Sequence, residues 1–590
     1  MKKRFYLLGM LVAGLTFAGC TDDIDDATGS GVASGDKGYV KIAINLPTTS
    51  GQSTRSANDN FDDGLESEYA VNDVCLLLFK GANENVATYV GGYDLDLTFN
   101  TEDPNNDNVT SKAAVVQEII NPKLAAGESL YALAVVNPNS SMVDYTSTAG
   151  TLYVSGSSVT DLAGLKKKIS NINSDLGLFI GSSSTPSFTM TNAPLATLPA
   201  NNPGGLTDLN VTTLVPLTIY DSSEKASLGK ADDIYVERVV AKVTVASDNF
   251  TKDEGKFYMT VTDNSGNYSG DQVYMDGWYL NVTNRSTKLV RDVTGWDTWK
   301  GYSNPDNATS SINRFFGMEE PYRVYWAVDG NYNNWSSDQT YEFNYYTENS
   351  GEPTTAQIGS DKPLYCLENT FDVAHMQQGE TTGIVFKMTY NFAPDRPAGT
   401  FYMIGTDETI YDMDDETTYN DVDNNFIAKV QTLLGENSID QLAVNSSAKG
   451  GYYDTQAKMK ELFKTESGSI TDEQALNLLN ALGEVKVYEN GATYYYAARI
   501  KHFGDYYTPL PADANESTWE TSDYVAENHL GRYGVVRNNW YEIVISSISG
   551  PGMPEKPEPE PEEPDDKDYA YVNCHINILS WAKRQQNVEL

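Results

Sequence analysis

The side chains that could do chemistry are few in this chain and widely spaced. Four histidines occur in 590 residues, and none has a cysteine or a second histidine at metal-ligand spacing. They are His375, His502, His529 and His575. The chain has no G-x-S-x-G, H-E-x-x-H or G-x-x-x-x-G-K-[ST] motif, and acidic pairs are too common to single out a carboxylate dyad. We therefore predict no catalytic site, no cofactor and a protein that is not an enzyme.

One acidic stretch carries oxygen ligands of the kind that calcium prefers. It runs from Asp412 to Asn425 and reads DMDDETTYNDVDNN. It lacks the Gly and the terminal Glu at EF-hand spacing, so a solvated loop is the simpler interpretation. We predict no metal site in the chain.

Cys20 is the one residue that indicates a covalent modification. Basic Lys2, Lys3 and Arg4 precede a short apolar stretch that ends in FAGC. This pattern resembles a bacterial lipobox, in which residues 1–19 are removed and Cys20 receives acyl chains such as palmitate. An ordinary secretory signal with an incidental Cys is the alternative. The acidic TDDIDD that follows is similar to the surface-export signal of Bacteroidota lipoproteins.

The other cysteines predict no disulfide framework. Cys75, Cys366 and Cys574 are an odd number and lie far apart. Cys75 and Cys574 stand in apolar, strand-like contexts, which favour buried free thiols. The fold must therefore be held by its cores.

The charge balance excludes one class of partner. Asp and Glu number 82 against 41 Lys and Arg, for a net charge of −41. Neutralising phosphates needs clustered cations, so nucleic acid is not a predicted partner. Strong self-repulsion suits a protein that faces water outside the cell.

The first strand-like segment precedes a loop that a protease could cut. In YVKIAINLP the apolar residues alternate, which predicts a half-buried, edge-forming strand. Its inward face consists of Val40, Ile42, Ile44 and Leu46. The polar TTSGQSTRSANDNFDDGLES follows, with Arg55 as its only basic residue. We predict cleavage between Arg55 and Ser56, so that residues 20–55 form a propeptide containing this strand.

The middle of the chain predicts a mainly β fold. Short strand-like runs separated by Asn, Pro, Gly and Ser turns favour β-sandwiches. We place one sandwich domain at 56–232 and a second at 233–550, which opens near YVERVVAKVTV. Two helices are predicted in the second domain, over NNFIAKVQTLLG and TDEQALNLLNALG. Asn490 and Gly491 predict a tight hairpin turn.

The C-terminal end combines a stiff linker with an apolar strand. Residues 551–568 contain six Pro and eight acidic residues, which favour an extended tether that could reach about 50 Å. Residues 569–590 follow and are predicted to form a detached strand. Its apolar residues are Val572, Cys574, Ile576, Ile578, Leu579, Trp581, Val588 and Leu590. The even-numbered residues of this set share one face, as a strand that fills a groove would require, whereas Leu579 and Trp581 lie on the opposite face.

These two ends suggest a mode of assembly. If cleavage released the first strand, the vacated groove would expose unpaired backbone groups and apolar pockets. The C-terminal strand of another copy could fill it by strand addition. A contact of this head-to-tail kind does not close, so it would generate a filament.

The order of these features resembles the type V pilus fimbrilins of Bacteroidota, most closely the stalk subunit of the minor (short) fimbriae. The resemblance rests on Cys20, INLP…TRSANDN, YVERVVAKVTV, and VVRNNWYEIVISSI with its Pro/acidic linker and final strand. It implies two transthyretin-like, Greek-key β-sandwich domains, an outer membrane lipoprotein precursor, cleavage by an Arg-specific protease, and donor-strand exchange. It also implies a cell-surface fimbrium with anchor and tip fimbrilins as partners, and roles in adhesion, biofilm and virulence. Phe17 replaces the usual Leu of the lipobox, and the helical insertion is unexplained.

Two other interpretations remain open. The chain could be a monomeric surface lipoprotein that binds glycan or a host protein, with its C-terminal strand folded back on its own sheet. It could also be a non-polymerising anchor or tip fimbrilin. The tethered tail disfavours a tip, and Arg55 in a soft loop disfavours an anchor.

Overall fold

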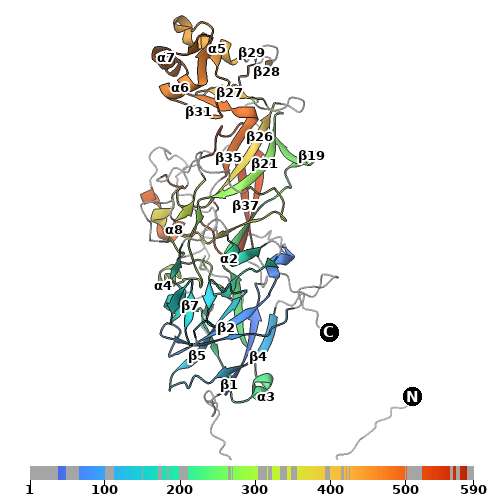
Figure 1. The fold of residues 1–590 in the computed structure, drawn as a ribbon, viewed down its shortest axis with the longest axis vertical. Helices are drawn as coiled ribbons and strands as arrows, with labels where there is room; N and C mark the ends of the chain where they lie inside the picture. The colour runs from blue at the N-terminus through green and yellow to red at the C-terminus, as the bar shows by residue number, and fades with distance from the viewer. Residues whose placement is uncertain are drawn as a thin grey trace, which may run out of the picture.

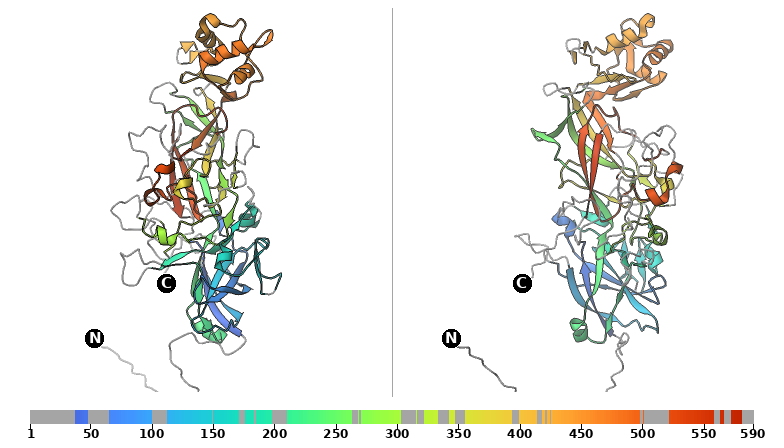
Figure 2. Two further views of the ribbon diagram at one scale, coloured as in Figure 1. Left: turned by 90° about the vertical axis from the view of Figure 1, so that its left-hand side faces the viewer. Right: turned by 180° about the vertical axis from the view of Figure 1, so that it is seen from behind.

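The computed structural model has an elongated shape built from three parts stacked along one axis (Figure 1). A β-rich domain lies at one end, a second one in the middle, and a small helical part at the other end. Both further views show the same order (Figure 2). The structure describes residues 37–47, 65–99, 112–148, 150–170, 176–182, 185–197, 210–262, 268, 270–302, 315, 322–332, 342–346, 355–392, 399–413, 418–419, 422–423, 425–497, 500, 521–557, 563–565 and 572–580. For 572–580 we describe the backbone only.

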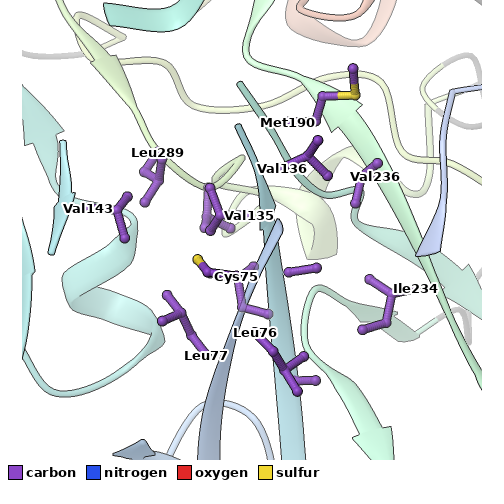
Figure 3. Packing of buried hydrophobic residues seen from close by; sticks show 14 of the residues in the cluster. Cys75, Leu76, Leu77, Val135, Val136, Val143, Met190, Ile234, Val236 and Leu289 are labelled. Atoms are coloured by element: carbon purple, nitrogen blue, oxygen red, sulfur yellow. The ribbon is translucent and has the colours of Figure 1, made fainter. Parts of the chain in front are cut away.

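The first domain is formed around one curled, nine-stranded sheet with the order β16-β1-β17-β12-β5-β2-β3, in which β4 adds to β1 and β15 to β5. Its strands are β1 (Lys37–Asn45), β2 (Val74–Gly81), β3 (Thr88–Asp94), β4 (Lys112–Ile120), β5 (Ser129–Val136), β12 (Met190–Asn192), β15 (Val215–Leu217), β16 (Ile219–Tyr220) and β17 (Asp232–Arg238). The run VCLLLF of β2 is buried on both faces, as expected of a central strand. Cys75 stands opposite Val135 of β5, and Leu76 and Leu77 belong to the same apolar core (Figure 3).

The second domain is a sandwich of two sheets. One has the order β25-β18-β36-β37 and the other β19-β20-β21-β26-β35. Val243 and Ile543 of the first sheet share one apolar core with Trp278 and Phe386 of the second. The strands are β18 (Val240–Val245), β19 (Thr251–Asp253), β20 (Lys256–Thr260), β21 (Gln272–Asn281), β25 (Leu364–Leu367), β26 (Gly383–Asn391), β35 (Ala492–Ala497), β36 (Asn539–Ile548) and β37 (Val572–Ser580). The predicted mainly β fold is confirmed.

The chain passes from the first sheet to the second at Val239. β17 pairs with β1, whereas β18 pairs with β36. The sequence placed the boundary at 232/233, where β17 begins. Because β17 and β18 are both rich in β-branched residues, their composition does not separate the two domains.

The helical insertion has an apolar core of its own, which includes Phe426, Leu462 and Leu478. Its helices are α5 (Phe426–Leu434), α6 (Gln456–Leu462) and α7 (Asp472–Leu482). Its strands are β27 (Phe401–Ile404), β28 (Thr418–Tyr419), β29 (Val422–Asp423), β30 (Ala443–Val444), β31 (Gly451–Tyr453), β32 (Phe463–Thr465), β33 (Gly468–Ser469) and β34 (Val485–Tyr488). The two predicted helices are α5 and α7, so both predictions are confirmed. Thr471 and Gln474 form the expected capping box of α7, and Gly483 ends it at φ 70°.

The predicted hairpin at Asn490-Gly491 is wrong. Asn490 does adopt a positive φ of 53°. The turn, however, joins β34 to β35, which belong to different sheets. An Asn-Gly pair specifies a turn, but the strands on either side choose their partners by burial.

Short elements complete the described part of the chain. The remaining α-helices are α1 (Leu162–Leu165), α2 (Gly177–Ile180), α3 (Ser223–Leu228), α4 (Trp296–Trp299) and α8 (Ala526–His529). The 3-10 helices are η1 (Glu66–Tyr69), η4 (Val373–His375), η5 (Gly435–Asn437), η6 (Glu489–Gly491) and η8 (Thr521–Asp523). Within the residues that the structure describes, no helix has the length and apolarity that crossing a membrane requires.

Candidate functional site

β1 lies inside the first sheet, with strand neighbours on both sides. It pairs antiparallel with β4 over its whole length, from Lys37↔Ile120 to Asn45↔Lys112. On its other side it meets β16 and then runs parallel to β17. The prediction of an edge-forming strand is therefore wrong. Alternation identifies the buried face of a strand, but both neighbours of β1 come from distant parts of the sequence.

The four predicted face residues of β1 are buried in the first core. Val40, Ile42 and Ile44 are 0% exposed and Leu46 is 4% exposed. Burying four such side chains contributes about 6–12 kcal/mol, at about 1.5–3 kcal/mol each. β1 is thus a large part of what stabilises this domain in the uncleaved chain. Its displacement stays a prediction.

The opposite face of β1 is held by polar contacts. The Lys41 ammonium donates to the carbonyl oxygens of Ser227 and Gly229 at 2.8 and 2.9 Å, at the end of α3. The Asn45 amide donates to Asp233 Oδ1 at 3.1 Å and, at 3.4 Å, to the carbonyl of Ile234. Any strand that took the place of β1 would meet these same groups.

The predicted cleavage site falls between β1 and the next described element. Arg55 and Ser56 lie outside the described residues, as does Cys20. The described chain stops at Pro47 and resumes at Leu65, where η1 begins. A cut between Arg55 and Ser56 would separate β1 from η1 and leave η1 as the first described element of the mature chain.

η1 is fixed to the junction of the two domains by a buried charge cluster that the sequence did not reveal. Lys242 of β18 lies 2.9 Å from Glu68 Oε1, and both side chains are fully buried. Tyr365 donates to Glu68 Oε1 at 2.6 Å, and burial beside Glu68 raises the pKa of Tyr365. The Lys242 ammonium also lies 3.8 Å from the Trp540 ring centroid. Glu68 and Lys242 lie far apart in the sequence, so no local pattern indicates their pairing.

A second buried ion cluster joins the domains nearby. Arg291 Nε donates to Glu237 Oε1 of β17 at 2.8 Å. Arg537 Nε donates to Glu368 Oε2 at 3.1 Å. Burial raises the pKa of Glu237, while the guanidinium of Arg291 opposes that rise. Pairs of this kind are costly to break on one side, so the two domains are held in one relative position.

The C-terminal strand is paired in this chain, which corrects the prediction of a detached strand. β37 runs antiparallel to β36 at the edge of the second sandwich. Four predicted residues stand in register with buried residues of β36, in the pairs Val572↔Ile548, Cys574↔Ile545, Ile576↔Ile543 and Ile578↔Tyr541. Leu579 stands opposite Trp540. Trp581, Val588 and Leu590 lie outside the described residues.

The described parts of the linker are packed on the second domain, so the predicted free tether is also wrong for 551–557 and 563–565. Tyr488 donates to the carbonyl of Gly552 at 2.7 Å, and Tyr495 donates to the carbonyl of Gly550, directly before the linker, at 2.8 Å. Asp565 is 2% exposed and accepts from Thr381 Oγ1 at 2.6 Å. Proline removes backbone donors but leaves carbonyl acceptors, and tyrosine hydroxyls of the domain use them.

The thiols of the described residues are shielded from reaction by burial. Cys75 and Cys366 are free and buried, and burial raises the pKa of both thiols, that of Cys366 to about 12. For Cys574 only the backbone is described. Among the described residues no group of three or more His, Cys, Asp or Glu side chains is arranged to hold a metal ion.

Comparison with known sequences gives one family match. Residues 486–587 match the family described as "Major fimbrial subunit protein type IV, Fimbrillin, C-terminal". The matched stretch contains β35, β36 and β37. The predicted resemblance to fimbrilins is thereby confirmed, whereas the assignment to the stalk of minor fimbriae stays a prediction. A search of curated protein sequences gives no match.

Solved structures give weak overall likenesses. A candidate cell adhesion protein from Parabacteroides distasonis ATCC 8503 aligns with a TM-score of 0.38 and 12% identity, over 93% of this chain and 98% of that one. A fimbrilin from Porphyromonas gingivalis W83 aligns with a TM-score of 0.31 and 12% identity, over 92% of this chain and 98% of that one. At such low TM-scores we draw no conclusion from either.

Proposed function

We propose that this chain is the structural subunit of a cell-surface fimbria and polymerises when the C-terminal strand of one copy replaces β1 of the next. The precursor is an outer membrane lipoprotein anchored through Cys20. An Arg-specific protease cuts between Arg55 and Ser56 and frees β1. Anchor and tip fimbrilins complete the filament, which serves adhesion and biofilm formation.

The position of β1 is the observation that carries this proposal. A central strand that is buried on its apolar face stands directly before a polar stretch of sequence, residues 48–64, whose only basic residue is Arg55. Once cut free, it leaves two rows of backbone groups, on β4 and β17, without partners. A strand of matching alternation restores both ladders and refills the four pockets.

The packed state of β37 supports a stored form of the donor strand. In the isolated chain, β37 covers the open edge of β36. An open edge invites aggregation, so covering it keeps the precursor soluble. Exchange then moves the strand from a place with one strand neighbour to a place with two.

Limited proteolysis tests the proposal. An Arg-specific protease should convert the purified precursor into ladders of SDS-resistant oligomers. Arg55→Lys should resist that protease but form ladders after trypsin, which separates the cut itself from any role of the side chain. Deletion of residues 569–590 should abolish ladders under both proteases. Ladders that survive this deletion would contradict strand exchange.

A monomeric surface adhesin is the second candidate, and one observation favours it. β37 pairs with β36 along its described length, and the linker is hydrogen-bonded to the same domain. In a permanent monomer this arrangement persists after cleavage. Hydrogen exchange decides between the two: the β37 amides of a cleaved monomer would keep the protection of the precursor, and no ladder would form.

A further inference from the structure

The C-terminal strand is an approximate copy of β1. YVKIAINL (39–46) and YVNCHINI (571–578) are identical at four of eight positions when aligned in the same direction. The identical pairs are Tyr39/Tyr571, Val40/Val572, Ile44/Ile576 and Asn45/Asn577. The second segment can also be aligned in the opposite direction, with its apolar residues still opposite those of β1. In that alignment only Ile42/Ile576 and Asn45/Asn573 are identical. The likeness therefore has a direction.

The shared residues are those that β1 uses on both faces. Val40 and Ile44 fill the first core and are 0% exposed. The Tyr39 hydroxyl donates to Glu118 of β4 at 3.1 Å. The Asn45 amide is 8% exposed and donates to Asp233 and Ile234 of β17. A strand without this amide would leave the buried Ile234 acceptor with one partner fewer.

We propose that the C-terminal strand of a second copy enters the place of β1 in the direction of β1, with Val572 at the position of Val40 and Asn577 at that of Asn45. This inference rests on the proposed function and adds its direction and register. The entering strand is antiparallel to β4 and parallel to β17, as β1 is. Asn577 donates to Asp233 and Ile234, and this pairing fixes the register because a slip by two residues removes it.

The differing residues make the copy a poorer fit than the original. Asn573 takes the place of Lys41, and its side chain is too short to reach the carbonyl oxygens of Ser227 and Gly229 at the end of α3, to which Lys41 donates. Cys574 takes the place of the fully buried Ile42 and leaves part of its pocket empty. β1 is also covalently attached, which gives it a high effective concentration at its own site. The C-terminal strand of a second copy therefore replaces β1 only after cleavage has released β1, so cleavage precedes strand exchange.

Disulfide trapping tests direction and register in the cleaved full-length protein. Asn573→Cys is combined with Val116→Cys or with Lys112→Cys, in a Cys574→Val background. Val116 is the β4 partner of Lys41, and Lys112 is the β4 partner of Asn45. Directly opposed residues of antiparallel strands have the Cα spacing that a disulfide needs.

The expected result is a covalent ladder on non-reducing gels from the Val116 pair, which reductant collapses, and at least tenfold less from the Lys112 pair. A covalent ladder from the Lys112 pair alone would show a reversed strand and overturn the inference while leaving strand exchange intact. A covalent ladder from Asn573→Cys with Ala114→Cys or Glu118→Cys, in place of Val116→Cys, would show a register shifted by two residues and would also overturn the inference. If the Cys574→Val parent forms no SDS-resistant ladder, strand exchange itself fails.

A second measurement does not depend on cysteines. Asn577→Ala should slow ladder formation several-fold, whereas Asn573→Ala should leave it within twofold of the parent. The variant Asn573→Lys with Cys574→Ile resembles β1 more closely and should form ladders faster. Equal rates for all these variants would overturn the proposed register.

Discussion

β1 and β37 are similar strands in opposite situations. β1 has neighbours on both sides and fills a core, whereas β37 has one neighbour and lies at the edge of its sheet. Their attachments differ as well. β1 precedes a polar stretch of sequence, residues 48–64, with a single Arg, while β37 follows a linker whose described parts are hydrogen-bonded to the second domain. The strand with two neighbours is thus the one that the proposed cleavage would free, and the strand with one neighbour would stay attached to its own subunit.

Loss of β1 should have the largest effect. In a variant without residues 569–590, cleavage and removal of β1 should cost the first domain about 6–12 kcal/mol, because four buried apolar side chains are lost. Pulsed alkylation can follow each domain, since Cys75 is buried in the first and Cys366 in the second. Cys75 should become reactive and Cys366 should stay protected. Protection of both thiols would show that β1 is dispensable.

Breaking the ion pair at the junction should have the next largest effect. Glu68→Gln leaves Lys242 charged and buried without its counter-charge, which should lower the free energy of unfolding by about 3–5 kcal/mol. The double variant Glu68→Leu with Lys242→Met should recover much of that loss. Urea denaturation measures both. If Glu68→Gln were as stable as the parent, the ion pair would not anchor η1 to the junction of the two domains.

Matched truncations compare the two strands directly. Ile44→Ala should lower stability by about 2–5 kcal/mol, because a buried side chain between two neighbouring strands leaves a cavity. Ile576→Ala, at the corresponding position of the copy, should cost less, since β37 has strand backbone on one side only. Chemical denaturation of the uncleaved chain gives both values. Equal losses would remove the distinction between a central and an edge strand.

The effect with the narrowest reach is a pH dependence in the second domain. Burial raises the pKa of Asp329 to about 7, although the backbone N–H groups of Thr370 and Asn331 favour its ionised form. Between about pH 4 and 7 the folded state holds a proton that the unfolded state has released, so the free energy of unfolding falls as pH rises.

For this reason the unfolding equilibrium constant should rise by about tenfold between pH 5 and 6, and the dependence should level off above about pH 7. Asp329→Asn is the control that lacks it. The difference should be visible in the exposure of Cys366 and not in that of Cys75. A parent and an Asp329→Asn variant with parallel pH profiles would contradict the assignment.

The sequence predicted the local features of the fold well. The capping residues of α7 and the alternation of Val40, Ile42 and Ile44 depend on neighbours within a few positions, and the structure agrees with both. The partners of β1 were not predictable in this way, because β4 and β17 are chosen by long-range burial. The same holds for Lys242 and Glu68, whose pairing no local pattern indicates.

The C-terminal end shows a second kind of failure. The Pro/acidic composition of 551–568 predicts an extended segment but not whether a domain surface offers donors to its carbonyls. Tyr488 donates to the carbonyl of Gly552 here. The likeness between Ile44-Asn45 and Ile576-Asn577 is visible in the printed sequence, but it gains meaning only once the contacts of Asn45 are known.

The central claim is that β1 is absent from every assembled subunit because the C-terminal strand of another copy has replaced it. Mass spectrometry of subunits recovered from SDS-resistant oligomers tests this most directly. We predict chains that begin at Ser56 and retain residues 569–590, with no peptide from residues 37–47. Oligomers whose subunits retain the segment before Ser56 would contradict the account.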